Sequence, residues 1–157
     1  MLAATHIIFG AGCSLLYGNM MGMGPEQIML VTATGAVGSL LPDVDTPTST
    51  FGKKIRPISD IISFVFGHRG ITHSLLMVGA LIFVLIHYID MPSWVYGLIF
   101  GYLSHLLGDW ITPSGIPLFW PLKRRYRSPI AFKTGSFVEF FFGAVFLMGG
   151  ITWYFQR

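Results

Sequence analysis

Five long apolar segments constrain the fold of this 157-residue chain more than any other feature of its sequence. They cover approximately residues 2–17, 27–41, 74–89, 94–111 and 137–155. Because a helix rises about 1.5 Å per residue and a bilayer core is about 30 Å thick, only the last two have a comfortable spanning length. Hydrophobic residues make up 53% of the chain and charged residues only 11%, which is too apolar for an ordinary soluble domain of this size. We therefore expect an all-α, polytopic membrane bundle of about five hydrophobic helices. The chain is expected to form a single domain over residues 1–157.

A further segment, residues 55–66, has a different pattern. Its apolar side chains recur at helical spacing, while Lys54, Arg56, Ser59 and Asp60 supply a polar face. Such a segment is typical of an amphipathic helix that lies on a membrane surface. We expect one interfacial helix here in addition to the hydrophobic ones.

Basic residues indicate the orientation of the bundle. They fall in two connections, which contain Lys53, Lys54, Arg56 and Arg69, and Lys123, Arg124, Arg125, Arg127 and Lys133. The connections 19–26 and 90–93 contain no Lys or Arg. By the positive-inside rule the two basic loops are cytoplasmic, which predicts a multi-pass protein of the inner (cytoplasmic) membrane with its amino terminus inside and Arg157 outside. The net charge of +3 is explained by these loops, so we expect no nucleic-acid partner.

Other features of the sequence limit the chemistry. Cys13 is the single cysteine, so neither a disulfide nor a cysteine-based zinc site is available. Any metal must therefore be bound by His, Asp or Glu.

The first apolar segment is expected to be retained rather than cleaved as a signal peptide. No Lys or Arg precedes it, and His6 lies within it.

Ionisable residues gather where the segments reach the cytoplasmic side of this topology. They are His6, Asp43, Asp45, His68, His73, His105, Asp109 and Glu139. His105 and Asp109 are four residues apart, so on a helix both side chains project from the same face. Asp43 and Asp45 follow Pro42 in a segment whose carboxylates would suit two neighbouring ions. Ionisable groups near hydrocarbon are costly unless they are paired or functional, and imidazole with carboxylate favours zinc over manganese or magnesium.

Each group taken alone also has a structural explanation. His6 fits an interfacial histidine, and Asp43 and Asp45 fit turn residues that end a helix. His68 with Arg69 fits a basic interfacial anchor. The pair four residues apart in the fourth segment is harder to explain in this way, because it lies within a long apolar stretch. The set as a whole therefore favours a metal site.

The second basic loop suggests how a substrate is held. Residues 112–127 combine turn-forming residues with Trp120 and several cations, so Trp120, Arg125 and Arg127 are candidates for binding an anionic headgroup. The same cations also fit a non-selective lipid anchor. Arg69 differs because it adjoins a presumed ligand, His68, and is placed to neutralise charge on a phosphoryl group.

The motifs together resemble the YdjM family. They are His6, Leu-Pro-Asp-Val-Asp at 41–45, Gly-His-Arg-Gly-Ile-Thr-His-Ser at 67–74, Gly-Tyr-Leu-Ser-His-Leu-Leu-Gly-Asp at 101–109 and Thr-Pro-Ser-Gly at 112–115 with Trp120-Pro121. The resemblance covers nearly the whole chain and implies an inner-membrane, metal-dependent hydrolase. It also implies a ligand set of His6, Asp43, Asp45, His68, His73, His105 and Asp109. The family is distantly similar to zinc-dependent phospholipase C and P1 nuclease, although a shared fold does not by itself transfer a reaction.

We therefore expect a membrane-embedded metal-dependent hydrolase that cleaves a phosphoester of a phospholipid or lipid-linked substrate at the cytoplasmic face. Two or three zinc ions would acidify a water that attacks phosphorus, with manganese or magnesium as alternatives. The predicted catalytic residues are Asp43, Asp45, Arg69, Asp109 and Glu139, the last as a ligand or general base. Two rivals stay open, a divalent-cation transporter and a non-catalytic metal-binding membrane regulator. The sequence leaves the substrate, the number of ions and the oligomeric state open.

Overall fold

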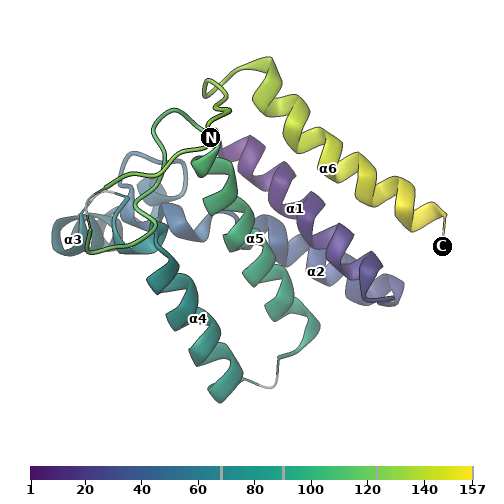
Figure 1. Cartoon of the computed structure of the whole chain (residues 1–157). Helices are drawn as coiled ribbons and strands as arrows, with labels where there is room; N and C mark the ends of the chain where they lie inside the picture. The colour runs from purple at the N-terminus through teal and green to yellow at the C-terminus, as the bar shows by residue number, and fades with distance from the viewer. Residues whose placement is uncertain (68, 90, 123, 157) are drawn as a thin grey trace.

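The computed structural model describes residues 1–67, 69–89, 91–122 and 124–156, and in this part of the chain all long elements are helices (Figure 1). The α-helices are α1 (Ala3–Met20), α2 (Pro25–Gly38), α3 (Arg56–Phe66), α4 (Leu75–Tyr88), α5 (Ser93–Trp110) and α6 (Phe137–Phe155). Short 3₁₀ turns are η1 (Leu41–Asp45), η2 (Gly52–Ile55) and η3 (Ile71–His73). The all-α prediction is confirmed, and the helices lie close to the predicted segments.

Local sequence signals explain several helix starts. Pro25 is the first residue of α2, where its missing N–H costs nothing, and the side chain of Gln27 accepts a hydrogen bond from the Gly24 N–H at 3.3 Å. The hydroxyls of Ser74 and Ser136 accept from the backbone N–H groups of Met77 and Glu139, which caps α4 and α6. These caps set where each helix begins.

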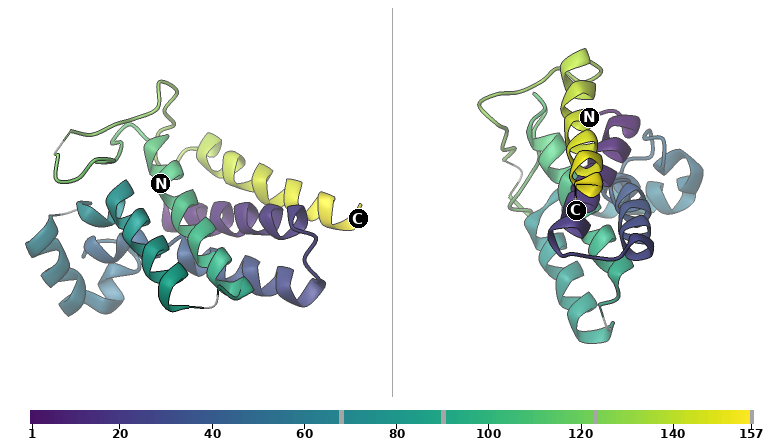
Figure 2. Two further views of the ribbon diagram at one scale, coloured as in Figure 1. Left: turned by 60° about the horizontal axis from the view of Figure 1, so that its bottom comes forward. Right: turned by 90° about the vertical axis from the view of Figure 1, so that its right-hand side faces the viewer.

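Helices α1, α2, α5 and α6 form the packed part of the bundle, with α1 in contact with the other three (Figures 1 and 2). Small residues allow close approach. A Cβ on Gly12 would lie 2.6 Å from the backbone nitrogen of Leu147 on α6, and one on Gly101 of α5 would overlap the carbonyl of Gly35 on α2. Such contacts are typical of helices that associate within a membrane. Helix α4 stands apart and packs along α5 (Figure 1).

Two helical stretches in the described chain are long and apolar enough to cross a membrane, Pro25–Asp45 and Phe137–Phe155. The prediction of about five hydrophobic helices is therefore confirmed only in part. Helix α4 is apolar but has 14 residues, and α5, although predicted to be of spanning length, is not among the two. Helices α1 and α5 bury polar side chains such as His6 and His105 inside the bundle, which lowers their hydropathy.

Helix α3 occupies the predicted amphipathic segment and lies at the edge of the molecule (Figure 1). Its apolar side chains point outward: Ile58, Ile61, Phe64 and Val65 are all exposed, Phe64 by 91%. Ser59 is the buried residue of the helix. The helix packs on η1, the turn that carries Asp43 and Asp45.

Candidate metal centre

The predicted ligands meet where the start of α1, the turn η1, the turn η3 and the second half of α5 converge. The side chains of His6, Asp43, Asp45, His73, His105 and Asp109 are all buried there. His68, another predicted ligand, lies outside the described residues. Among the described residues, two groups of three place one ligand atom each within 4.8 Å of one another: His6, His105 and Asp109, and Asp43, His73 and His105.

The first group is held together by stacking and by a carboxylate. The rings of His6 and His105 stack with centroids 3.8 Å apart and an interplanar angle of 10°. His6 Nε2 lies 3.2 Å from Asp109 Oδ1. His6 Nδ1 and Asp109 Oδ2 are buried without a hydrogen-bond partner. Because buried polar atoms are normally satisfied, two such orphans in one cluster indicate a missing partner.

The second group brings two imidazole nitrogens face to face. His105 Nε2 and His73 Nε2 are 3.2 Å apart, and His105 Nε2 lies 3.9 Å from Asp43 Oδ1. His105 Nδ1 donates to the carbonyl of Ser39 at 2.6 Å, which leaves the lone pair of a neutral ring on Nε2. An acceptor bonded to the ring nitrogen that does not bind metal is what fixes the tautomer of a metal-binding histidine.

The arrangement fits a zinc-like ion. Tetrahedral ligands about 2.0–2.1 Å from zinc are separated from one another by about 3.3 Å. The two Nε2 atoms of His73 and His105 are 3.2 Å apart, and both lie 3.8 Å from Asp109 Oδ2. Two facing lone pairs repel one another unless a proton or a metal ion lies between them. These residues therefore fit a divalent cation without large movement.

Asp45 lies on the other side of His73. Its carboxylate accepts from the Gly70 N–H at 3.0 Å, from the Thr46 hydroxyl at 3.1 Å and from the Thr72 hydroxyl through a short contact. Because the Thr72 hydroxyl hydrogen is directed to Asp45, His73 Nδ1 donates to Thr72 Oγ1, 3.0 Å away. The role of Asp45 as a ligand stays a prediction, whereas its contacts place it as a positioning group for His73.

Sequence reasoning did not find Thr72, Ser39 or Tyr102. Tyr102 donates its hydroxyl to the backbone carbonyl of Thr72 in a short contact, which anchors η3 against α5. Thr72 could have been identified from the sequence, because in the Thr-His-Ser motif it directly precedes the predicted ligand His73. A backbone acceptor such as the Ser39 carbonyl leaves no signal in the sequence.

Arg69 adjoins the cluster in an uncommon backbone conformation, with φ of 52°. A guanidinium nitrogen lies 3.5 Å from Asp109 Oδ2, and its Nε is buried without a hydrogen-bond partner. The side chain is 23% exposed. A non-glycine residue in the left-handed region carries strain that the surrounding structure must offset, and such residues concentrate at functional sites.

Two cavities are lined by Arg69. The first, here called the aromatic cavity, has a volume of about 310 Å³, and its walls include Phe66, Trp120, Leu122 and Arg125. The second, the hydroxyl cavity, has a volume of about 270 Å³, and its walls include Asp43, Thr46, Thr48, Ser49 and Thr50. Of the predicted substrate-binding residues, Arg69, Trp120 and Arg125 therefore come together. Arg127 is exposed and lines neither cavity.

Glu139 is buried but engages backbone amides rather than the histidines. It accepts from the Leu2 N–H at 2.7 Å and from the Gly135 N–H at 2.6 Å. It belongs to neither group of converging ligand atoms in the described chain. The amino group of Met1 forms a short ion pair with Asp109. The catalytic role of Glu139 stays a prediction, and its contacts indicate that it fastens the start of α1 to the start of α6.

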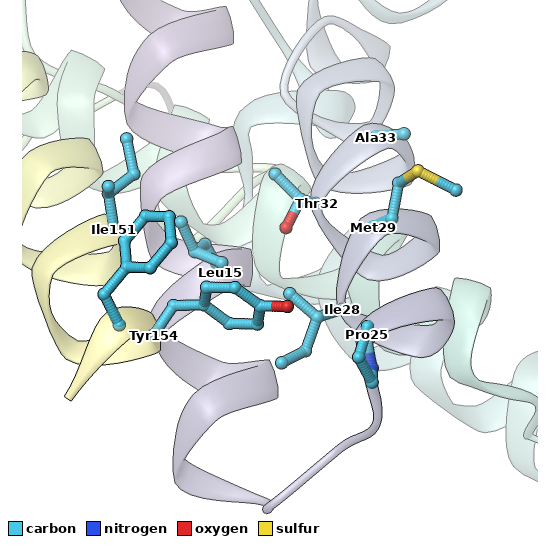
Figure 3. Close-up of a pocket in the computed structure, with 9 residues that line it drawn as sticks. Leu15, Pro25, Ile28, Met29, Thr32, Ala33, Ile151 and Tyr154 are labelled. Carbon is cyan, nitrogen blue, oxygen red and sulfur yellow. The ribbon is translucent and has the colours of Figure 1, made fainter. Parts of the chain in front are cut away.

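A larger apolar cavity of about 580 Å³ lies away from the site (Figure 3). It is formed by α1, α2 and α6, with Leu15, Ile28, Met29, Ile151 and Tyr154 among its lining residues. Leu15 is nine residues along α1 from His6, a distance of about 14 Å. None of the described residues that line this cavity is a His, Asp or Glu, so it has no part in the metal centre.

Comparison with known proteins identifies the family. The family described as YdjM inner membrane protein matches residues 1–156. The chain belongs to this family. It is 38% identical over 142 residues to the inner membrane protein YdjM of Escherichia coli strain K12, covering 83% of this chain and 70% of that protein. It is 40% identical over 139 residues to the uncharacterized protein YvsG of Bacillus subtilis strain 168, covering 88% and 85%.

No solved structure matches the chain. Membership in the YdjM family confirms the resemblance found in the sequence and the expected inner-membrane location. The name of the Escherichia coli relative states a membrane location, and neither name states an activity.

Proposed function

We propose that this YdjM-family protein is a membrane-embedded, metal-dependent hydrolase that cleaves a phosphoester of a phospholipid or lipid-linked substrate. The observation that carries the proposal is the buried convergence of His73 Nε2 and His105 Nε2 with Asp43 and Asp109. Four ionisable groups in one buried cluster beside a cationic side chain are costly unless an ion or a reaction uses them. The two cavities at Arg69 give a substrate access to this cluster.

Zinc is the proposed cofactor, in two or three ions, with manganese or magnesium as the alternatives. His105 belongs to both ligand groups, but its Nδ1 is bonded to Ser39, so its Nε2 serves one ion. A further ion would draw on the unpartnered His6 Nδ1 and on the predicted ligand His68, which lies outside the described residues. When bound, a divalent ion would withdraw charge from a phosphoryl oxygen and acidify a water molecule.

The residues of the chain have separate tasks in this proposal. The histidines and the carboxylates Asp43 and Asp109 bind metal, and Asp45 orients His73 through Thr72. Arg69 points at Asp109 from the wall of both cavities, where its guanidinium neutralises charge that builds up on the phosphoryl oxygens. Trp120 and Arg125, in the wall of the aromatic cavity, are the proposed contacts of the substrate, and Arg127, exposed in the same loop, is the proposed contact of neighbouring anionic lipid.

The proposed site lies at the cytoplasmic face of the inner membrane. One basic loop connects η1 to α4 and the other follows α5, so both adjoin elements that carry ligands, as the positive-inside rule requires of cytoplasmic loops. The exposed apolar side chains of α3, with Lys53, Lys54 and Arg56 beside them, suit insertion into the headgroup region of an anionic leaflet.

The proposal is tested on protein purified in detergent. Metal content is measured first, and phospholipids and lipid phosphates are then screened for release of phosphate or headgroup. Arg69→Lys should lower turnover about 100-fold by removing a bidentate donor, as expected for loss of one oxyanion-stabilising group. Arg124→Lys is the matched control, because Arg124 lies over the Tyr126 ring and lines neither cavity. If the protein binds metal but turns over no phosphoester, the proposed hydrolase activity is wrong. The remaining functions are then a metal-binding regulator and a transporter.

A further inference from the structure

We propose that the substrate is a phosphodiester of a membrane lipid whose two ester arms occupy the aromatic cavity and the hydroxyl cavity. This inference rests on the proposed function and assigns a substrate class to the same site. It comes from one juxtaposition: the two cavities have different walls, but Arg69 belongs to both.

Arg69 marks the position of the phosphoryl group. One guanidinium nitrogen is 3.5 Å from Asp109 Oδ2, within the metal centre, while the buried Nε has no hydrogen-bond partner. A phosphoryl oxygen would satisfy this donor, since guanidinium groups bind phosphate through two parallel N–H bonds. The aromatic cavity and the hydroxyl cavity both begin at Arg69. A phosphodiester has one organic arm for each cavity, whereas a phosphomonoester has one arm and would leave one cavity empty.

The hydroxyl cavity suits the polar arm. Its wall includes Thr46, Thr48, Ser49 and Thr50. The hydroxyls of Thr46 and Ser49 are bonded to Asp45 and to backbone groups, so the hydroxyls of Thr48 and Thr50 are the ones that would donate to and accept from a ligand. Asp43 also lines it, so the cavity opens directly onto the ligand group that contains His73 and His105. A glycerol, amino-alcohol or sugar headgroup offers the complementary hydroxyl or ammonium groups.

The aromatic cavity suits the membrane-side arm, which is the ester arm that leads to the lipid tails. Phe66 and Trp120 form an edge-to-face pair with ring centroids 6.3 Å apart, and Leu122 lines the same cavity. Phe66 is the last residue of α3, the helix whose apolar face, including the 91% exposed Phe64, is turned outward. The cavity is therefore continuous with the part of the protein that suits contact with the lipid surface.

The dimensions limit what each cavity holds. Volumes of about 310 and 270 Å³ lie near the lower end of the range of small-molecule pockets, about 300–1,000 Å³. Each cavity can accept a small group such as a glycerol unit, and neither can accept a pair of acyl chains. The tails of the lipid must therefore remain in the bilayer while its phosphodiester reaches Arg69.

The reaction balances as a hydrolysis. The oxygen of water forms a bond to phosphorus, one of the two ester P–O bonds breaks, and one proton of the water passes to the departing alkoxide. The products are an alcohol and a phosphomonoester, and no oxidant or other co-reactant is required. Product analysis identifies the bond: diacylglycerol and a headgroup phosphate from one ester, or phosphatidic acid and a free headgroup alcohol from the other.

The first test measures binding without turnover, using EDTA-treated protein in detergent and isothermal titration calorimetry. The probes are glycerophosphoglycerol, a diester with two small arms, and inorganic phosphate, which has none. Removing two hydroxyls with Thr48→Val and Thr50→Val should weaken binding of the diester about tenfold and leave binding of phosphate unchanged. Thr134→Val is the matched control, because Thr134 is an exposed loop residue outside both cavities. Equal weakening of both ligands would overturn the assignment of the hydroxyl cavity.

The second test compares phosphatidylglycerol with phosphatidic acid of the same acyl chains, using metal-loaded protein in mixed micelles. We expect kcat/KM for the diester to exceed that for the monoester at least tenfold. Turnover of phosphatidic acid alone would overturn the inference while leaving the proposed hydrolase intact. Turnover of neither lipid, with metal bound, would overturn both. Equal turnover of glycerophosphoglycerol and phosphatidylglycerol would contradict the membrane-side role of the aromatic cavity.

Discussion

Replacing Thr72 by valine removes one hydroxyl that joins Asp45 to His73. In the native structure the hydroxyl donates to Asp45 Oδ2 and accepts from His73 Nδ1, with a separation of 3.0 Å from the ring nitrogen. Valine has a similar shape but forms neither bond, so the Nδ1–H loses its acceptor at 3.0 Å and keeps only Asp45 Oδ2, at 3.6 Å, which holds the tautomer of the ring less firmly. Because Asp45 retains the Gly70 N–H and the Thr46 hydroxyl, the carboxylate itself stays partly satisfied.

The expected loss follows from these contacts. Removing a group that orients a metal-binding histidine typically costs about 10- to 100-fold in metal affinity, which corresponds to about 1.4–2.7 kcal/mol. Zinc affinity is measured by competition with a chromophoric chelator, and thermal unfolding in detergent is followed in parallel. Thr34→Val is the matched control, since its hydroxyl donates to the backbone carbonyls of Leu30 and Val31 in its own helix α2. A Thr72→Val protein that binds zinc within about twofold of the native affinity would refute the positioning role of Thr72 and Asp45.

Three further predictions address the ligands, the carboxylate on α6 and the surface helix. The double variant His105→Ala, Asp109→Ala should lose its bound metal, measured by elemental analysis of the purified protein, because it removes a nitrogen shared by both ligand groups and the carboxylate beside it. Glu139→Gln should destabilise the fold by about 1.5–3 kcal/mol in thermal unfolding, because one buried backbone N–H then faces a donor, while metal content stays unchanged. Loss of metal without loss of stability would instead support Glu139 as a ligand. A fluorescent label at Phe64→Cys, in a Cys13→Ser background, should be quenched by nitroxide lipids in anionic vesicles, and an unquenched label would place α3 in water.

The sequence was sufficient to predict the helices and most of the cluster. A spacing of four residues placed His105 and Asp109 on one helix face, and α5 carries both into the centre. The segment 55–66 was recognised as amphipathic from its periodicity, and α3 occupies it. These features are local, so periodicity and spacing reveal them directly.

The sequence was less informative about Asp43 and Asp45, whose separation by two residues suggested a shared role. The segment forms the 3₁₀ turn η1, in which residues two apart point in directions about 120° different. Asp43 therefore faces His105, whereas Asp45 faces Gly70 and Thr72. The choice between an extended segment and a 3₁₀ turn depends on the packing of α3 against η1, which no local pattern encodes.

Glu139 shows the same limit. Its position at the start of α6 fits a ligand, but a carboxylate at a helix start also satisfies backbone N–H groups, here that of Gly135, four residues before it, and that of Leu2. The long-range bond to Leu2 depends on the packing of α6 against α1, which the sequence does not specify.

The close crossing of α2 and α5 at Gly35 and Gly101 links the spacing of two backbones to the chemistry of a nitrogen atom. One turn beyond Gly101, the imidazole of His105 donates to the Ser39 carbonyl over 2.6 Å. A side chain at position 101 that moved α5 outward by about 1 Å would take this pair beyond hydrogen-bonding distance. The ring proton would then be shared between the two nitrogens, and the metal would face a mixture of tautomers. A methyl group at position 101 would therefore change which nitrogen of His105 is available to the metal, although it touches no ligand atom.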